Sequence, residues 1–309
     1  MAKVIDLFRR RPEAAPAGDP AARLLAGFSL EVMPRTAAKV ESFAELLPEG
    51  TAVYVAHVDG TPVEDMVATA ARLAREGFEV VPHLPARSIP DRAALADLLA
   101  RYRGEAGVRR ALLLGGGRAA PVGDFHCAAQ LLETGLFDRA GFARLDFAGH
   151  PEGSRDLDPA GGEANAMEAL RLKRRLGEAT GARLGLVTQF AFEAAPVAAW
   201  ARRLRAAGLD LPVRVGVAGP AKLQTLIRYA MTCGVGPSVQ VLRRRATDVT
   251  RLALPFAPDG MLRDLAAELD ADPGLPVEGV HLFPLGGIGA TADFAARLRA
   301  GAVRRAARA

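Results

Sequence analysis

The sequence is poor in cysteine and contains no long apolar run. Its 309 residues include two cysteines, Cys127 and Cys233, which are too few for a disulfide framework and form no CxxC pattern. This usage is typical of a reducing compartment, so we expect a cytoplasmic protein. No apolar run reaches the ~18 residues that a membrane span requires. Residues 1–11 are basic and lack the apolar centre of a signal peptide, so we expect no membrane partner.

Lysine and aromatic residues are scarce as well. The net charge is +5, which would suit a nucleic-acid partner, but only four of the 40 Lys and Arg residues are lysine. The arginines are scattered among acidic residues, and the aromatic residues, 6% of the chain, do not interleave with them. We therefore expect no nucleic-acid partner. The composition leaves a homo-oligomer open.

What remains is a globular composition, 50% hydrophobic and 24% charged, arranged in a regular rhythm. From residue 27, eight short apolar runs alternate with longer segments of helical periodicity. The runs cover residues 28–32, 52–56, 79–84, 110–114, 143–148, 183–188, 213–217 and 280–284. The helical segments cover residues 37–47, 63–76, 91–102, 124–134, 163–180, 195–207, 221–231 continuing to 269, and 291–299.

Eight successive β-α units predict an α/β protein of one domain, a (βα)8 TIM barrel over residues 27–309. Residues 1–26 are predicted to form a short N-terminal extension, with a helix at 1–11 and a Pro/Ala/Gly linker at 12–20. The largest insertion is expected at residues 236–271, between the last two strands. Barrel active sites lie at the carboxyl ends of the strands. The positions to inspect are Glu31, His57, His83, 115–118, 150–152, 189–193, 218–222 and 284–287.

Charged and titratable residues stand at several of these strand ends. An ionised carboxylate is costly to bury, so Glu31 is expected either to pair, for example with Arg35, or to stay protonated and act as a general acid. His83 could orient a ligand or be a structural histidine. Together with His57 and His150 it gives three histidines on one rim. No HxH or HExxH spacing accompanies them, so we expect no metal site.

Glycine and amide groups mark the other strand ends. Gly115–Gly117 would let a ligand approach the backbone and would expose N–H groups to an anion, or would simply form a tight turn. Gln189 offers a donor and an acceptor that match a heterocycle with adjacent C=O and N–H groups. Phe192 could wall an aromatic ligand or belong to the core. Two glycine-rich loops, 216–222 and 284–291, stand where many barrels bind phosphate.

Six of these segments carry a family resemblance. They are FSLEVMPRT, VVPHLPARS, LDFAGHPEGS, RLKRRLGEATGARLGLVTQFAFE, GVAGPAKLQTLIRYAMT and VHLFPLGG. In order, spacing and strand position they resemble the methylenetetrahydrofolate reductase family over residues 27–301. The most specific part is a glutamate after the first strand combined with TQF after the sixth.

The resemblance implies a flavoprotein of one-carbon metabolism. In the family, NAD(P)H reduces a bound FAD, and the flavin passes the hydride to 5,10-methylenetetrahydrofolate to give 5-methyltetrahydrofolate. The resemblance makes Glu31 the general acid, with a pKa raised towards neutrality by burial, and Gln189 the residue that hydrogen-bonds the pterin. Leu223 and Phe192 are expected beside the folate. The expected FAD-binding residues are His83, Gly116, Gly117, Ala148, His150, Glu168, Arg171, Arg174 and Arg175, with the arginines holding the diphosphate.

The chain also departs from the family pattern. Gly115–Gly117 stand where the family has Arg-Gly-Asp, and Gly286 and Gly287 replace its Asn-Arg. Three hypotheses follow: a folate-dependent oxidoreductase, a folate- or flavin-binding barrel without the reductase chemistry, or a phosphate-ligand barrel enzyme of another class. Joint retention of Glu31 and Gln189 argues against the third.

Overall fold

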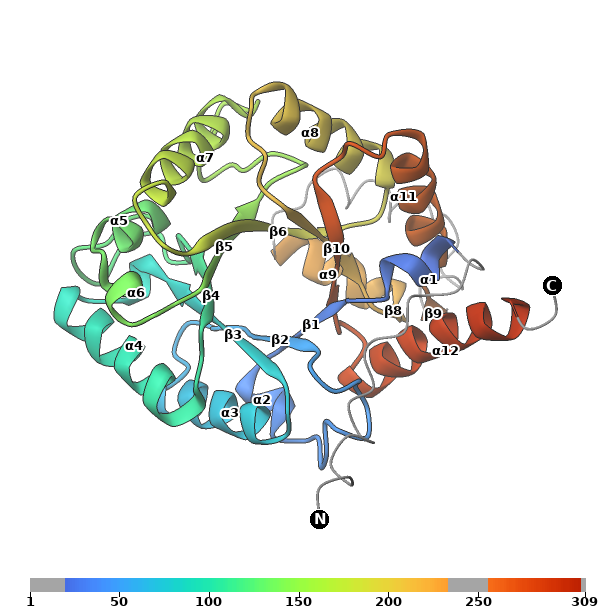
Figure 1. Ribbon diagram of the computed structural model, residues 1–309, viewed down its shortest axis with the longest axis horizontal. Helices are drawn as coiled ribbons and strands as arrows, with labels where there is room; N and C mark the ends of the chain where they lie inside the picture. Colours follow the sequence, from blue (N-terminus) through green and yellow to red (C-terminus); the bar gives the residue numbers. More distant parts are fainter. Residues whose placement is uncertain (1–19, 233–254, 307–309) are drawn as a thin grey trace, which may run out of the picture.

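The protein is a closed parallel β-barrel surrounded by helices, as a computed structural model describes it for residues 20–232 and 255–306 (Figure 1). The barrel strands are β1 (Ser29–Val32), β2 (Ala52–Val55), β3 (Glu79–Pro85), β4 (Arg110–Leu114), β5 (Arg144–Gly149), β6 (Arg183–Ala191), β7 (Val213–Ala218) and β10 (Val277–Phe283). They close in the order β1-β10-β7-β6-β5-β4-β3-β2, with β1 parallel to both β2 and β10. The predicted single-domain (βα)8 barrel is confirmed.

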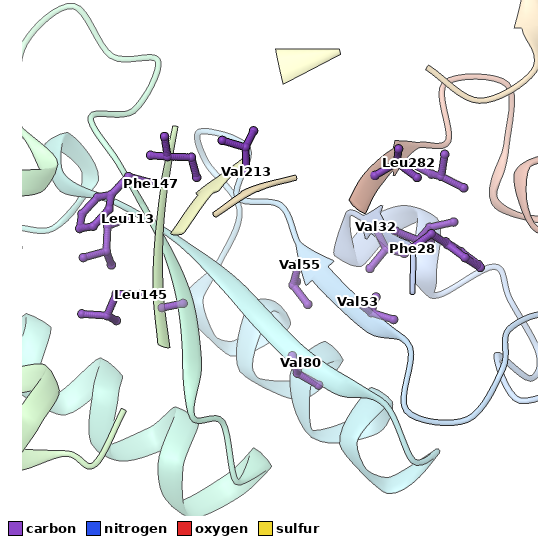
Figure 2. Close-up of a cluster of buried hydrophobic side chains, with 14 of the residues drawn as sticks. Phe28, Val32, Val53, Val55, Val80, Leu113, Leu145, Phe147, Val213 and Leu282 are labelled. Carbon is purple, nitrogen blue, oxygen red and sulfur yellow. The ribbon is translucent and has the colours of Figure 1, made fainter. Parts of the chain in front are cut away.

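Helices cover the outside of the barrel. They are α1 (Pro20–Leu24), α2 (Pro34–Ala37), α3 (Val63–Arg75), α4 (Arg92–Ala106), α5 (Ala128–Glu133), α6 (Leu136–Arg139), α7 (Ala164–Gly177), α8 (Ala194–Ala206), α9 (Leu223–Thr232), α11 (Asp259–Ala271) and α12 (Ile288–Ala306). A 3-10 turn, Ala86–Ser88, follows β3. The outward strand residues pack against these helices in one large core, part of which Figure 2 shows around Val53, Leu113 and Phe147. No helix among the described residues is long and apolar enough to cross a membrane.

One predicted helix is absent. The segment 37–47 forms turns after α2 ends at Ala37. Its backbone groups bond to α3 instead: the Arg72 guanidinium donates to the carbonyls of Ala37 and Val40, at 3.0 and 2.5 Å. The Phe43 N–H donates to the Glu76 carboxylate at 2.7 Å. Because a neighbouring helix satisfies these groups, the segment needs no helical bonds of its own.

The ends of the chain differ in part from the prediction. The end of the expected extension and linker contains α1, whose Ala21 lies in the main core together with Leu25. The predicted helix at 1–11 lies outside the described residues, as do residues 236–254 of the insertion predicted at 236–271, and the rest of that insertion contains α11. Two short strands that the sequence did not predict, β8 (Ala221–Lys222) and β9 (Pro255–Phe256), pair antiparallel.

The interior of the barrel is polar at its amino end and apolar in the middle. The Asp146 carboxylate, fully buried, accepts bonds from Tyr54 Oη at 2.9 Å and Arg144 Nε at 2.8 Å, and lies 3.4 Å from Arg110 Nη2. Tyr54, Val81, Leu112 and Val187 pack above this network. The amino end is therefore closed by paired side chains, which leaves the carboxyl end for a ligand.

Candidate functional site

Two adjoining cavities open at the carboxyl ends of the strands. They share a floor formed by Glu31, His83, Leu114, Gln189, Phe190 and Phe283. The first, here named the β5 cavity, has a volume of about 390 Å³ and extends under residues 148–156. The second, named the β1 cavity, has a volume of about 590 Å³ and extends between residues 32–40 and 283–289. Both volumes are typical of small-molecule sites.

Glu31 lies between two histidines. Its Oε2 is 3.4 Å from Nε2 of His83 and 3.8 Å from Nε2 of His281. Ser29 Oγ lies 2.9 Å from Nδ1 of His281, and which of the two donates depends on the imidazole tautomer. The Tyr54 ring packs edge-on against His281, 4.6 Å between centroids. These contacts orient both rings toward the carboxylate, which pairs with histidines and not with Arg35.

The ionisation of this cluster differs from the prediction. Burial alone would raise the pKa of the Glu31 carboxyl, but the imidazoles of His281 and His83 outweigh it and hold that pKa below its usual value. Burial lowers the pKa of His83 to about 4, against the opposing effect of Glu31. The expectation of a raised Glu31 pKa was therefore wrong, because it considered burial without these partners. At neutral pH, Glu31 is an ionised carboxylate and His83 a neutral imidazole.

Gln189 is positioned by an irregularity in β6. The register between β6 and β7 shifts between Val187 and Phe190, and the Thr188 hydroxyl there accepts the Gly216 N–H at 2.8 Å. The Gln189 Oε1 accepts the N–H of Phe190 at 3.1 Å. This bond holds the amide, and leaves its Nε2 group to donate to a ligand over the floor.

His150 and Ala148, which were predicted to bind FAD, line the β5 cavity. Burial lowers the pKa of His150 to about 4, and the charge of Lys173 adds to this effect. Lys173 is on α7, with its Nζ 5.2 Å from the centre of the Phe147 ring. Burial lowers the pKa of Lys173 as well. Lys173 was not among the predicted site residues, although its neighbours Arg171 and Arg174 were.

The other α7 residues assigned to FAD lie away from both cavities. Arg171 and Arg175 pair with Glu168, at 3.4 and 3.2 Å, and all three side chains are exposed. Arg174 bonds the Gly208 carbonyl and lies 3.7 Å from Glu178. The structure therefore does not place these arginines where a ligand on the barrel floor could meet them. The helix turns Ala166, Met167, Leu170 and Lys173 toward the barrel instead.

The loop that contains Gly115–Gly117, after β4, is held by hydrogen bonds from Arg87. The Gly115 carbonyl accepts the Arg87 N–H at 3.0 Å, and the Arg87 guanidinium donates to the carbonyl of Arg118 at 2.9 Å and to Asp156 at 2.6 Å. Gly116 has a φ of +98°, and a Cβ there would lie 3.0 Å from the Pro85 Cβ. Gly116 and Gly117 line neither cavity. In this structure the run makes a turn held by Arg87.

Two expected folate-contacting residues are core residues. Phe192 and Leu223 are 3% and 5% exposed, and both belong to an apolar cluster behind the floor with Phe190 and Phe283. Neither lines the β1 or the β5 cavity. They support the floor from behind.

The two glycine-rich loops pack against each other. A Cβ on Gly286 would lie 2.0 Å from the Pro220 carbonyl oxygen, and a Cβ on Gly219 would lie 2.3 Å from Thr291 Oγ1. The N–H of Gly219 donates to Phe283, and that of Gly287 donates to Pro284. These glycines allow close backbone approach, and two of the N–H groups a phosphate would need are already bonded.

Two residues that line the cavities, His281 and Phe283, were not predicted from the sequence. His281 and Phe283 alternate along β10 with outward residues, a period-two pattern that places both inside the barrel. This pattern was available in VHLFPLGG but was not used. Among the described residues, no group of three His, Cys, Asp or Glu side chains is placed to hold a metal ion.

Comparison with known proteins places the fold. No family model matches the chain. The structure is similar to that of an uncharacterized protein from Clostridium thermocellum, described as binding two copies of 5-methyl-5,6,7,8-tetrahydrofolic acid. The match has a TM-score of 0.52 at 11% identity and covers 90% of this chain and 98% of that chain. At this identity the likeness shows a common fold.

Proposed function

We propose that this protein binds a reduced folate on the barrel floor and acts as a folate-dependent oxidoreductase. The observation that carries the proposal is the convergence of the Glu31 carboxylate and the Gln189 amide on one floor from strands far apart in the sequence. The folate ligand of the structurally similar Clostridium protein and the resemblance to methylenetetrahydrofolate reductases support it. A TIM barrel alone would not, since this fold hosts many chemistries.

The floor suits a pterin. The fused ring presents adjacent N–H and C=O groups at one edge and two apolar faces. Gln189 Nε2, which has no hydrogen-bond partner among the described residues, can donate to that edge, and Leu114 and Phe283 supply apolar surface. The ionised Glu31 carboxylate beside them stabilises positive charge on a ring nitrogen.

The proposed reaction interconverts 5,10-methylenetetrahydrofolate and 5-methyltetrahydrofolate. In the reductive direction a proton goes to N10 as the bond from N10 to the methylene carbon breaks, leaving a cationic iminium at N5. A hydride from NAD(P)H then adds to that carbon and gives the methyl group. Glu31 supplies the proton after taking one up from solvent, and its carboxylate faces the iminium afterwards. Gln189 orients the ring and carries no proton.

FAD is a cofactor that the resemblance implies. The residues expected to hold its diphosphate, Arg171, Arg174 and Arg175, line neither cavity, and Gly116 and Gly117 are turned into a fastened loop. The residues present do not fit the group as the family binds it. No step of the proposed reaction is routed through flavin. FAD therefore enters only as one condition of the assay.

The test is folate turnover by the purified protein with NADH or NADPH, with and without added FAD. We expect the wild type to reduce 5,10-methylenetetrahydrofolate, and Glu31→Gln to abolish this while still binding 5-methyltetrahydrofolate. Because the Glu31 pKa lies below its usual value, kcat/KM of the wild type should rise as the pH falls from 8 to 6. Wild-type turnover by Glu31→Gln would overturn the proposed role of this residue.

One outcome selects the second hypothesis, a binding protein without reductase chemistry. This hypothesis is favoured because the arginines expected to hold the FAD diphosphate line neither cavity. Tight binding of 5-methyltetrahydrofolate with no turnover under any of the four conditions would establish it. Absence of folate binding would overturn both hypotheses.

A further inference from the structure

The β1 cavity changes in character from its floor to its mouth. The floor carries Glu31, His83 and Gln189. Above the floor the walls are largely apolar, and are formed by Met33, Val40, Val58, Leu285 and Ile288. Val58 is 49% exposed, an apolar side chain that water still reaches. Lys39 lines the cavity as well, and its exposure places it on the solvent side.

Lys39 is held in place through its backbone. Its N–H donates to the Thr36 carbonyl at 3.2 Å, and the Thr36 hydroxyl donates to the Met33 carbonyl at 2.9 Å. On the other side, Arg72 bonds the carbonyls of Ala37 and Val40. The segment that failed to become a helix is thus fixed by α3 and presents a lysine at the cavity.

The charge of Lys39 is not neutralised by any acidic side chain that the structure describes. Over residues 20–232 and 255–306, no acidic side chain lies within ion-pair distance of its ammonium group. Apart from histidines, it is also the single cationic side chain that the described residues contribute to this cavity. The mouth of the β5 cavity differs, because it is lined by charges of both signs, Glu152, Arg155 and Asp156, and Asp156 also pairs with Arg87. The β1 mouth, whose described lining has a lysine and no acidic side chain, therefore favours an anionic group.

We propose that the β1 cavity is the site for the benzoyl-glutamate part of the folate, with Lys39 binding a carboxylate of the glutamate tail. This inference rests on the proposed pterin site. The order of chemistry along the cavity, polar floor, apolar walls and cation, matches the order of pterin, benzoyl ring and glutamate along the ligand. The benzoyl ring covers Val58 and its neighbours, and the glutamate carboxylates meet the lysine.

The experiment compares two probes by calorimetry, 5-methyltetrahydrofolate and 5-methyltetrahydropteroate, which lacks the glutamate. We expect the wild type to bind the folate about three- to tenfold more tightly, as one charge-assisted contact allows, and added salt to reduce the difference. Lys39→Met should weaken folate binding by the same factor and leave pteroate binding within about twofold. Lys39→Arg should retain the preference.

Arg35→Met is the matched control. Arg35 is four residues away and carries the same charge, but it lines the neighbouring surface pocket, which shares Met33 and Val58 with the β1 cavity, and not the cavity itself. It should leave the preference unchanged. Equal binding of both probes by the wild type, or an equal effect of Lys39→Met on both, would overturn tail recognition while the pterin site stands. A wild type that binds neither probe would overturn the pterin site and this inference together.

Discussion

Glu31 and Gln189 contribute different groups to the floor: Glu31 a charged carboxylate, and Gln189 a neutral amide. The Glu31 carboxylate is ionised because His83 and His281 face it. The Gln189 amide is held by the N–H of Phe190. A change at the first position should alter chemistry, and a change at the second should alter binding.

Replacing Gln189 tests this division. Gln189→Ala removes one neutral hydrogen bond to the pterin, which is worth about 1–2 kcal/mol, or roughly five- to thirtyfold in affinity. We expect that loss in the Kd for 5-methyltetrahydrofolate measured by titration, with kcat reduced much less. A large fall in kcat at unchanged Kd would instead make Gln189 part of the chemistry.

Buried histidines make stability sensitive to acid. The pKa of His150 is about 4 in the folded chain and near its ordinary value of 6.5 when unfolded. Below pH ~6.5 the unfolded chain therefore binds more protons, and stability falls as the pH drops from about 6.5 towards 4. His150→Gln should reduce the loss between pH 7 and pH 5 by about 1–2 kcal/mol, measured by urea unfolding.

His126→Gln is the control for this prediction. His126 is exposed on the loop before α5 and donates its backbone N–H, not its ring, to Gln130. The pH dependence of unfolding should be that of the wild type. An identical acid loss in the His150 variant would show that its burial does not set the acid response.

At the scale of elements, a bulge in β6 needs a glycine in β7. A Cβ on Gly216 would lie 2.5 Å from the Thr188 carbonyl oxygen and 2.6 Å from that of Gln189. These are backbone atoms, so a side chain can be accommodated only if the bulge moves. The same contact that lets the two strands approach therefore positions the amide of Gln189.

Gly216→Ala should accordingly affect both stability and binding. We expect a destabilisation of about 1–3 kcal/mol from overpacking, and weaker folate binding because Gln189 is displaced. Gly104→Ala is the matched control: it lies within α4, a Cβ there meets no atom within 4 Å, and the change should stabilise the protein by about 0.5–1 kcal/mol. Thermal unfolding and titration measure both effects. Normal binding by Gly216→Ala would contradict the link between bulge and site.

On the scale of the whole molecule, the two ends of the barrel have different tasks. Asp146 closes the amino end with Tyr54, Arg110 and Arg144, while the cavities open at the carboxyl end. Stability and ligand binding should therefore be separable by mutation, as in other TIM barrels.

Asp146→Ala tests the separation. Removing the buried carboxylate takes one partner from Arg110 and from Arg144, which keep Glu79 and Glu278, so we expect a loss of about 1–3 kcal/mol in unfolding free energy. Folate affinity, measured where the variant is still folded, should stay within about threefold of wild type. Arg101→Gln, which breaks pairs with Glu64 and Glu105 on the surface, should leave the unfolding midpoint nearly unchanged. Loss of binding in the folded Asp146 variant would show that the two ends are coupled.

The sequence alone determined the architecture and two positions on the floor. Apolar periodicity of two and of 3.6 residues is a local property, so it predicted all eight barrel strands within a few residues of their observed bounds. Glu31 and Gln189 were found because each ends a strand, and in a barrel all strand ends meet on one rim. That also brought His83, Ala148 and His150 to the cavities as expected.

Tertiary structure decided three features that sequence periodicity does not determine: the conformation of residues 37–47, the direction of side chains on α7, and the ionisation of Glu31. Residues 37–47 have a helical pattern but form turns, because Arg72 and Glu76 hydrogen-bond to their backbone groups. Arg171, Arg174 and Arg175 pair on the outer side of α7, because the direction of a side chain depends on how its helix packs. The charge of Glu31 depended on His281, 250 residues away in the chain and 3.8 Å away in space. Ionisation and cavity shape follow from contacts between distant segments, and only the folded barrel brings those segments together.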